Sequence, residues 1–226
     1  MRVAFAFLSL LPVFVTLGCR SIGRPLTDAD RALLRQVPVV LIRQESGGTP
    51  YLSSGLALSA TEILLTPHQL DLDDSSIEVE HIKTSYRIRR SALGDSVVEG
   101  WILIELADPI EAGGSIPSLD FETTIPPGSP CYIVGYPQPG IWLETEKQLI
   151  RAEVAQHATR NSDFHRQFLP IVTATDASEL GGSSGAPVVW RPSARDDFCV
   201  IGLLVGSVTA GRRLVTMVWR PEELGP

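Results

Sequence analysis

The residues best suited to chemistry lie in the run GGSSGAPVVW, from Gly181 to Trp190. Glycines at 181, 182 and 185 allow backbone conformations in which a larger side chain would clash. Such a turn can present Ser184 as a nucleophile, while the backbone N–H groups of Gly182 and Ser184 converge on a developing oxyanion. Taken alone, the run is equally well explained as a Gly/Ser surface turn between two strands, since single motifs produce false positives.

A serine hydroxyl needs a base to take its proton, and the chain has four histidines. His68 belongs to the segment Ser53–Leu70, in which a polar turn separates two apolar strands and the second strand delivers the histidine at its end. A base mounted on such a hairpin is held rigidly. The other three, His81, His157 and His165, are expected at solvated positions. Because neither an HExxH pattern nor a CxxC pair occurs, the sequence predicts no metal site, and no cofactor is expected.

In sequence order, these segments resemble the trypsin-like serine proteases of the chymotrypsin fold, and more closely their bacterial high-temperature-requirement, or Deg-type, branch. The segment TDASELGGSSGAP, Thr175–Pro187, carries that branch's Thr-Asp-Ala sequence at the usual spacing before the serine. ILLTPHQL is similar to the family's strand ending in Thr-Ala-x-His, with one residue fewer before the histidine. CYIVGYP, Cys131–Pro137, resembles the strand that opens the second barrel, and VIGLLVGS, Val200–Ser207, resembles the strand that flanks the substrate. The resemblance extends from about Val39 to Trp219.

The resemblance implies a polypeptide substrate and a specific set of site residues. Ser184 would be the nucleophile and His68 the general base. The backbone N–H groups of Gly182 and Ser184 would form the oxyanion hole. The substrate pocket would be lined by Ser178, Leu203 and Gly206.

The family's triad aspartate is replaced in this chain, because Gly100 stands where the carboxylate is expected before the strand Trp101–Leu106. That carboxylate fixes the tautomer of the imidazole, and its replacement by an amide lowers turnover by about 10⁴ in a well-studied protease. Glu99, or alternatively Asp95, could orient His68 if the start of the strand carries a bulge. Adjacent residues of an extended chain point to opposite sides, so the side chain of Glu99 would point away from the direction expected for a carboxylate at position 100. Two functions therefore stay open: a serine endopeptidase, or a pseudo-protease that binds polypeptide without cleaving it.

Two smaller departures lie inside the nucleophile segment itself. Ala186 stands where the family has a second glycine, and whether its methyl group fits depends on the backbone angle. Ser183 replaces the usual Asp or Asn, and its hydroxyl is expected to keep a hydrogen bond within the turn.

Short strands separated by turn signals dominate the remainder of the chain, which is typical of an antiparallel β-sandwich or barrel. With the resemblance, the expected fold is all-β: two antiparallel six-stranded barrels with the site in the crevice between them. Thr27–Arg35 is the one good helix candidate, because Thr27 can cap it. No PDZ domain is expected after the second barrel. The expected segments are a signal peptide at 1–18, a tether and short helix at 19–35, an N-terminal barrel at 36–112, a linker at 113–128 and a C-terminal barrel at 129–226.

The amino terminus predicts export from the cytoplasm. Met1–Gly18 has one early arginine and then an apolar stretch too short to span a bilayer comfortably, as in a cleaved secretory signal. The ending Leu-Gly-Cys resembles a bacterial lipobox, so Cys19 would become a lipidated first residue that anchors the protein to a membrane. Ordinary signal cleavage is the alternative. We therefore expect a cell-envelope lipoprotein, periplasmic or on the outer surface, or else a secreted protein.

Composition narrows the partners and the redox chemistry. The 226 residues are 44% hydrophobic, which is enough for a sizeable core, and the formal net charge of −7 speaks against nucleic acid as a partner. Cys131 and Cys199 could pair in an oxidising envelope, or each could be a buried hydrophobe, and the sequence favours neither.

Overall fold

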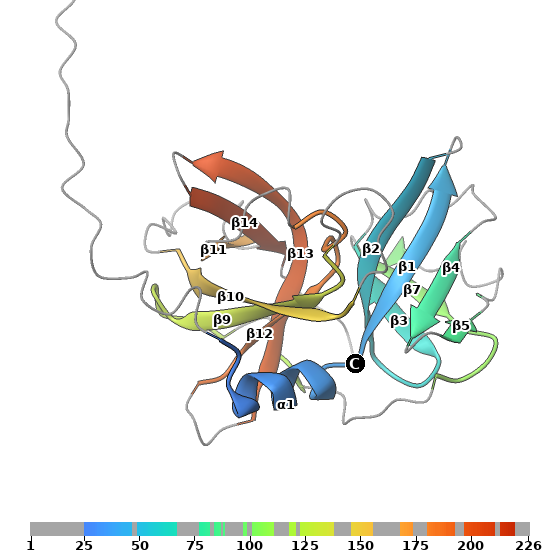
Figure 1. The fold of residues 1–226 in the computed structure, drawn as a ribbon, viewed down its shortest axis with the longest axis horizontal. Coiled ribbons are helices and arrows are strands. Elements are labelled where there is room, and N and C mark those ends of the chain that lie inside the picture. The colour runs from blue at the N-terminus through green and yellow to red at the C-terminus, as the bar shows by residue number, and fades with distance from the viewer. Residues whose placement is uncertain are drawn as a thin grey trace, which may run out of the picture.

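The computed structural model describes residues 25–46, 49–66, 77–81, 84–86, 88, 97–98, 101–110, 118–120, 123–137, 146–155, 168–173, 180–192, 197–210 and 213–219. In these residues the chain forms one helix and two curled sheets, which follow one another along the sequence (Figure 1). No helix in this part of the chain is long and apolar enough to cross a membrane.

The first sheet closes into a barrel of six strands. β1 to β5 and β7 form the ring in the order β1-β2-β3-β7-β5-β4, and an isolated bridge between Ile88 and Leu106 joins the chain after β5 to the chain after β7. β6 forms a short hairpin with β7. The strands are β1 (Val39–Ser46), β2 (Thr49–Ala57), β3 (Glu62–Leu65), β4 (Glu78–His81), β5 (Thr84–Tyr86), β6 (Val97–Val98) and β7 (Trp101–Glu105).

The second sheet closes in the same way. The ring runs β9-β10-β11-β14-β13-β12 and returns to β9, and β8, in the predicted linker, pairs in parallel with β13. The strands are β8 (Ser118–Leu119), β9 (Pro130–Gly135), β10 (Gln148–Val154), β11 (Phe168–Thr173), β12 (Pro187–Trp190), β13 (Cys199–Ala210) and β14 (Arg213–Trp219). The prediction of two antiparallel six-stranded barrels is confirmed.

Successive residues of β1 serve two different cores, as the period of two in a strand requires. Val40 and Ile42 point into the first barrel, whereas Val39 and Leu41 join a second cluster that also holds Leu203 of the second barrel. β1 is therefore apolar on both faces, which explains its run VVLI. Burial of this second cluster joins the two barrels.

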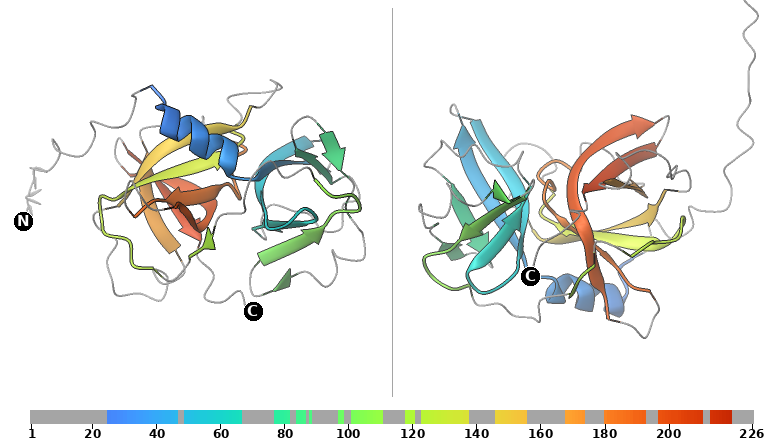
Figure 2. Two further views of the ribbon diagram at one scale, coloured as in Figure 1. Left: turned by 90° about the horizontal axis from the view of Figure 1, so that it is seen from below. Right: turned by 180° about the vertical axis from the view of Figure 1, so that it is seen from behind.

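The helix α1 (Asp28–Gln36) is stabilised at its start by a capping box. Thr27 Oγ1 accepts from Asp30 N at 3.2 Å, and the Asp30 carboxylate accepts from Thr27 N at 2.8 Å. Asp30 also pairs with Arg151 of β10. Leu33 is buried in the cluster shared by the barrels. Figure 2 shows α1 lying against the second barrel and leading into β1.

The two buried cysteines cannot form a disulfide in this fold. Trp190 of β12 lies opposite Cys131 on one side and opposite Cys199 on the other. The two cysteines are thus separated by about two strand spacings, roughly 9.6 Å, whereas a disulfide joins Cα atoms about 4.4–6.8 Å apart. Neither cysteine is in a disulfide, and burial, followed by the charge of Glu153, raises the pKa of Cys131 to about 12. The open question from the sequence is settled in favour of buried hydrophobes.

Candidate active site

Two consecutive tight turns present Ser184, and the first of them precedes it. The Leu180 carbonyl accepts a hydrogen bond from the backbone N–H of Ser183 at 3.0 Å. Gly182, the third residue of this turn, has φ 78°. A positive φ at that position marks a type II turn, which favours glycine because it has no Cβ. The second glycine of the run GGSSG is therefore required by backbone geometry.

The second turn contains Ser184 itself. The Ser183 carbonyl accepts from Ala186 N at 2.9 Å, and Gly185, again third in its turn, has φ 75°. Gly185 N donates to the carbonyl of Leu204 at 2.7 Å, and Leu204 N donates to the carbonyl of Ala186 at 2.9 Å. These bonds fix the turn to β13. Ser184 is half-buried at its tip.

Ala186, where the resemblance expects glycine, fits because its neighbour on β9 is itself a glycine. The Ala186 side chain is completely buried. A Cβ added to Gly135 would lie 2.7 Å from the Ala186 Cβ and 3.0 Å from the Oγ of Ser54. The methyl group of Ala186 therefore fits because Gly135 has no side chain, and a Cβ on Gly135 would occupy the same space.

The first barrel holds the nucleophile turn through Ser54 of β2. Ser54 N donates to the carbonyl of Ser184 at 2.7 Å, and the Ser54 hydroxyl donates to the carbonyl of Gly182 at 3.3 Å. The same hydroxyl accepts from Tyr136 N at 3.0 Å. Sequence reasoning missed this residue. Its only signal was the small-residue run Ser53–Gly55, whose purpose depends on a contact with a loop some 130 residues away.

Ser183 departs from the expectation for its side chain. Its backbone groups serve both turns, as described above. Its Oγ is buried and has no hydrogen-bond partner in the described part of the chain, so the expected side-chain bond within the turn is not present. An unpaired buried hydroxyl is energetically unfavourable.

The two described residues of the predicted substrate pocket differ in character. Leu203 is 0% exposed and lies across from Pro187 in the core, so its side chain offers no surface to a ligand. This side chain packs in the cluster shared by the two barrels, so Leu203 could line a pocket only through its backbone, and its role there stays a prediction. Gly206 is exposed, follows a register shift after Leu204, and has no atom within 4 Å of the position of a Cβ.

The remaining predicted site residues lie outside the described residues. They are His68, Glu99 with its alternative Asp95, Ser178 and Cys19, and Gly100 lies there too. Of the segment that leads to His68, the structure describes the residues up to Thr66, a buried residue that directly follows β3.

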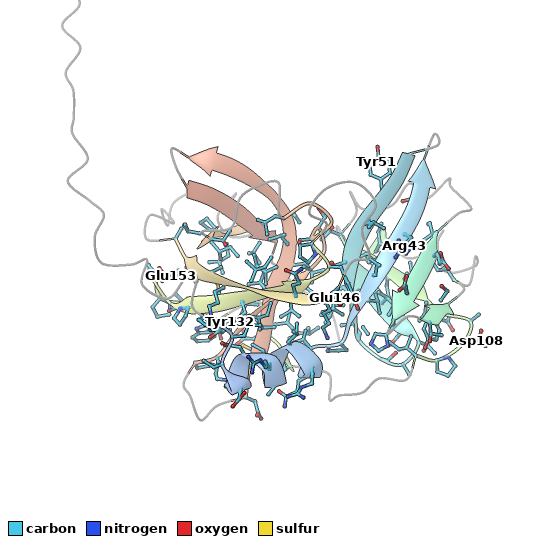
Figure 3. All side chains as sticks on the ribbon, viewed as in Figure 1. Arg43, Tyr51, Asp108, Tyr132, Glu146 and Glu153 are labelled. Carbon is cyan, nitrogen blue, oxygen red and sulfur yellow. The ribbon has the colours of Figure 1, made fainter. Side chains whose placement is uncertain are left out.

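An exposed aromatic side chain lies on the strand that supports the nucleophile turn. Tyr51 is 56% exposed, and Figure 3 shows it near the end of the hairpin formed by β1 and β2. It precedes Ser54 by three residues in the same strand. The tyrosine ring is therefore available to a partner that lies along β2.

Buried and half-buried titratable groups gather where the two barrels meet. Lys147 Nζ donates to the Val37 carbonyl, and burial lowers the pKa of Lys147 to about 8. His81 is 6% exposed, and burial, followed by the charge of Lys147, lowers the pKa of this histidine. The Tyr136 hydroxyl donates to the Val39 carbonyl at 3.4 Å. Burial, followed by the negative charge of Glu80, raises the pKa of Tyr136 to about 12. In the described ranges, no group of three or more His, Cys, Asp or Glu residues is arranged to hold a metal ion.

No protein-family model and no curated protein sequence matches the chain. Solved structures do. The Rv3671c protease from M. tuberculosis in its active form has a TM-score of 0.60 at 14% identity, covering 96% of this chain and 89% of that one. The serine endoprotease from Yersinia pestis has a TM-score of 0.57 at 17% identity, covering 88% of this chain and 64% of that one.

A protease paralogue described as inactivated shares the same arrangement. This scabies mite protein has a TM-score of 0.56 at 17% identity, covering 82% of this chain and 91% of that one. At these identities the likeness is one of fold. The double barrel described here is the chymotrypsin-like fold of the trypsin-like serine proteases.

Proposed function

We propose that this protein is a serine endopeptidase that hydrolyses peptide bonds with Ser184 as nucleophile. The observation that carries the proposal is the pair of type II turns around this serine, with glycine at φ 78° and 75° on either side. A surface turn between strands has no need to be held by a second barrel, yet Ser54 binds the Ser184 carbonyl at 2.7 Å. Such rigid support is what a nucleophile requires.

His68 is the proposed general base, and the register of the first barrel supports this choice. Leu56 of β2 lies opposite Leu64 of β3. If this antiparallel register continues by two residues, Thr66 comes to lie opposite Ser54, the residue bound to Ser184. The chain would therefore leave β3 beside the nucleophile turn, and His68 follows two residues later in the sequence.

The proposed reaction follows the acyl-enzyme route. Ser184 Oγ attacks the peptide carbonyl carbon while His68 takes its proton, and the N–H groups of Gly182 and Ser184 stabilise the resulting oxyanion. His68 then donates this proton to the leaving amine as the peptide bond breaks. Water, deprotonated by the same base, hydrolyses the ester and restores Ser184.

The triad acid is the point on which activity depends. With Gly100 at the expected position, Glu99, or alternatively Asp95, is the proposed orienting carboxylate. The competing function is a pseudo-protease that binds polypeptide in the same crevice without cleaving it, and the glycine is the observation that favours it.

Labelling with a fluorophosphonate probe distinguishes the two functions. A peptidase is expected to be labelled as wild type and to lose labelling in both Ser184→Ala and His68→Ala, with circular dichroism confirming that all three proteins are folded. Slower labelling in only one of Glu99→Gln and Asp95→Asn would identify the acid. A folded wild type that resists the probe would establish the pseudo-protease instead.

We further propose that the protein is held in a bacterial cell envelope by a lipid on Cys19, with secretion as the alternative. The support is the apolar segment that ends in Leu-Gly-Cys. Metabolic labelling with a fatty-acid analogue tests this. The lipid label should follow the wild-type chain and disappear in Cys19→Ala, whereas an unlabelled wild type found in the medium would indicate a secreted protein.

A further inference from the structure

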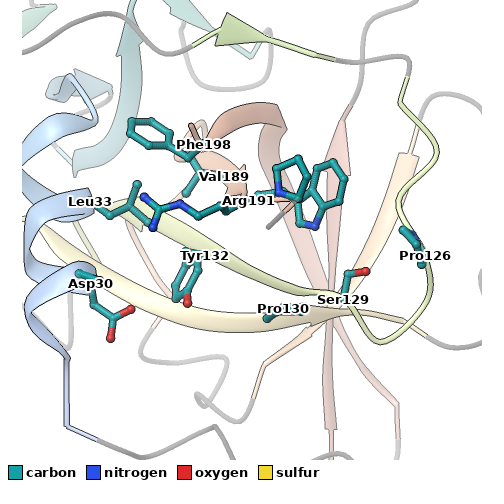
Figure 4. Close-up of a pocket in the computed structure, with 12 residues that line it drawn as sticks. Asp30, Leu33, Pro126, Ser129, Pro130, Tyr132, Val189, Arg191 and Phe198 are labelled. Carbon is teal, nitrogen blue, oxygen red and sulfur yellow. The ribbon is translucent and has the colours of Figure 1, made fainter. Parts of the chain in front are cut away.

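A cavity of about 470 Å³ lies between α1 and the second barrel (Figure 4). None of the residues that line it belongs to the nucleophile turn. Its walls are largely apolar, and they come from the helix, from the chain before β9 and from both ends of the loop between β12 and β13. The apolar lining residues include Leu33, Pro126, Pro130, Trp190, Pro192 and Phe198. The volume lies in the range typical of sites for small organic molecules, about 300–1,000 Å³.

Two charged residues line this cavity, and only one of them is neutralised by a described partner. Asp30 pairs with Arg151 of β10, which balances its charge. Arg191 directly follows β12, and its Nε is buried without a hydrogen-bond partner in the described part of the chain. Figure 4 shows the guanidinium group extending toward Leu33 on α1. Arg191 is therefore the charged lining residue whose charge is not balanced by a described ion pair, and its Nε is an unsatisfied buried donor.

Such a donor is costly to bury unless an acceptor satisfies it. The planar guanidinium group matches a carboxylate with two parallel hydrogen bonds, and such charge-assisted bonds are stronger than neutral ones. The prolines and aromatic rings around Arg191 in turn favour an apolar group next to that carboxylate. The lining thus combines one anion-binding group with a predominantly apolar wall.

We infer that this cavity binds a carboxylate carried on an apolar group, in a site separate from the proposed catalytic one. Two sources have this chemistry: the free C-terminus of an apolar peptide, and a small aromatic carboxylic acid. The inference does not depend on peptidase activity, because a pseudo-protease with this fold would have the same cavity.

Calorimetric titration of the full chain tests the inference in a Ser184→Ala background, which keeps peptide probes intact. The probes are acetyl-Ala-Leu-Phe with a free carboxylate, 3-phenylpropionate, and the amide of each. At least one acid is expected to bind about tenfold or more tightly than its amide, because a charge-assisted hydrogen bond is lost in the amide. Binding of the peptide acid alone assigns the site to C-termini, and binding of both assigns it to small carboxylic acids.

Three variants place the binding in this cavity. Arg191→Gln should remove the preference for acid over amide, whereas Arg31→Gln, at an exposed arginine of α1 paired with Asp28, should leave it unchanged. Ala29→Trp, at an exposed lining position of α1, should block binding of both acids while the fold is retained. Equal binding of acids and amides, or an acid preference that survives in folded Arg191→Gln, would overturn the inference.

Discussion

Ser54 in the first barrel donates its backbone N–H to the carbonyl oxygen of Ser184 in the second barrel at 2.7 Å. The Ser54 hydroxyl accepts from Tyr136 N at 3.0 Å and donates to the Gly182 carbonyl at 3.3 Å. Both glycine-containing turns are therefore tied to β2 at the contact between the barrels. These bonds fix the positions of the nucleophile and of the proposed oxyanion donors relative to β2 of the first barrel.

Replacing Ser54 by alanine tests this link. Ser54→Ala keeps the backbone bond to Ser184 but removes the hydroxyl's bonds to Gly182 and Tyr136 and leaves the buried N–H of Tyr136 without this acceptor. We expect the free energy of unfolding to fall by about 1–3 kcal/mol, and the rate of fluorophosphonate labelling to fall by about tenfold as the turn loosens. Ser53→Ala is the matched control, because Ser53 is also buried in β2 but is not bonded to the nucleophile turn. Equal effects of the two substitutions would contradict a specific role of Ser54.

The positive φ of Gly185 predicts a second loss of function. An L-residue in this left-handed region costs roughly 1–2 kcal/mol, so Gly185→Ala should lower the melting temperature and slow the labelling of Ser184. Gly206→Ala provides the comparison for the melting temperature only, because Gly206 is itself a predicted pocket residue; its Cβ would meet no atom within 4 Å, and it is not among the glycines with positive φ. If both alanines are tolerated equally, the turn does not need the conformation described here.

Ser183→Ala should stabilise the protein. The substitution removes a buried hydroxyl that has no partner in the described part of the chain, and it leaves the backbone bonds of both turns in place. Relief of an unsatisfied buried group contributes about 1 kcal/mol or more. Urea unfolding should show a higher midpoint for Ser183→Ala than for wild type, opposite in sign to Ser54→Ala. A lower midpoint would mean that the hydroxyl has an acceptor.

Tyr51 predicts a difference between small and large substrates. Its ring is 56% exposed on β2, three residues before the contact with the nucleophile turn. Tyr51→Ala should raise KM severalfold for a polypeptide substrate that extends along this strand, because an exposed aromatic surface is lost. Labelling by a small fluorophosphonate, which cannot reach that far, should be unchanged. A parallel loss in both assays would indicate damage to the turn itself.

The sequence predicted the barrels and the nucleophile turn because both depend on local patterns. Short apolar runs between turn signals, such as VVLI in β1, indicate strands, and the positions of Gly182 and Gly185 follow from the φ that a type II turn requires. The role of Ser54 could not be predicted, since a serine in an apolar strand gives no sign of which loop it will meet. The burial of the Leu203 side chain could not be predicted for a related reason: its position in the family pattern is informative, but only the packing of β13 decides which way its side chain points.

The half-buried Lys147 predicts how stability depends on pH. Burial lowers its pKa to about 8 in the folded protein, from 10.5 in an exposed lysine. Between these two values the unfolded chain binds the proton and the folded protein does not, so the free energy of unfolding should rise as the pH increases from 8 to 10.5. Lys147→Met removes the titrating group, and Lys147→Arg stays charged throughout this range, so both variants should lack this part of the rise. Urea unfolding at half-unit pH intervals measures the slope for all three proteins. A wild-type slope that persists in Lys147→Met would show that another group is responsible.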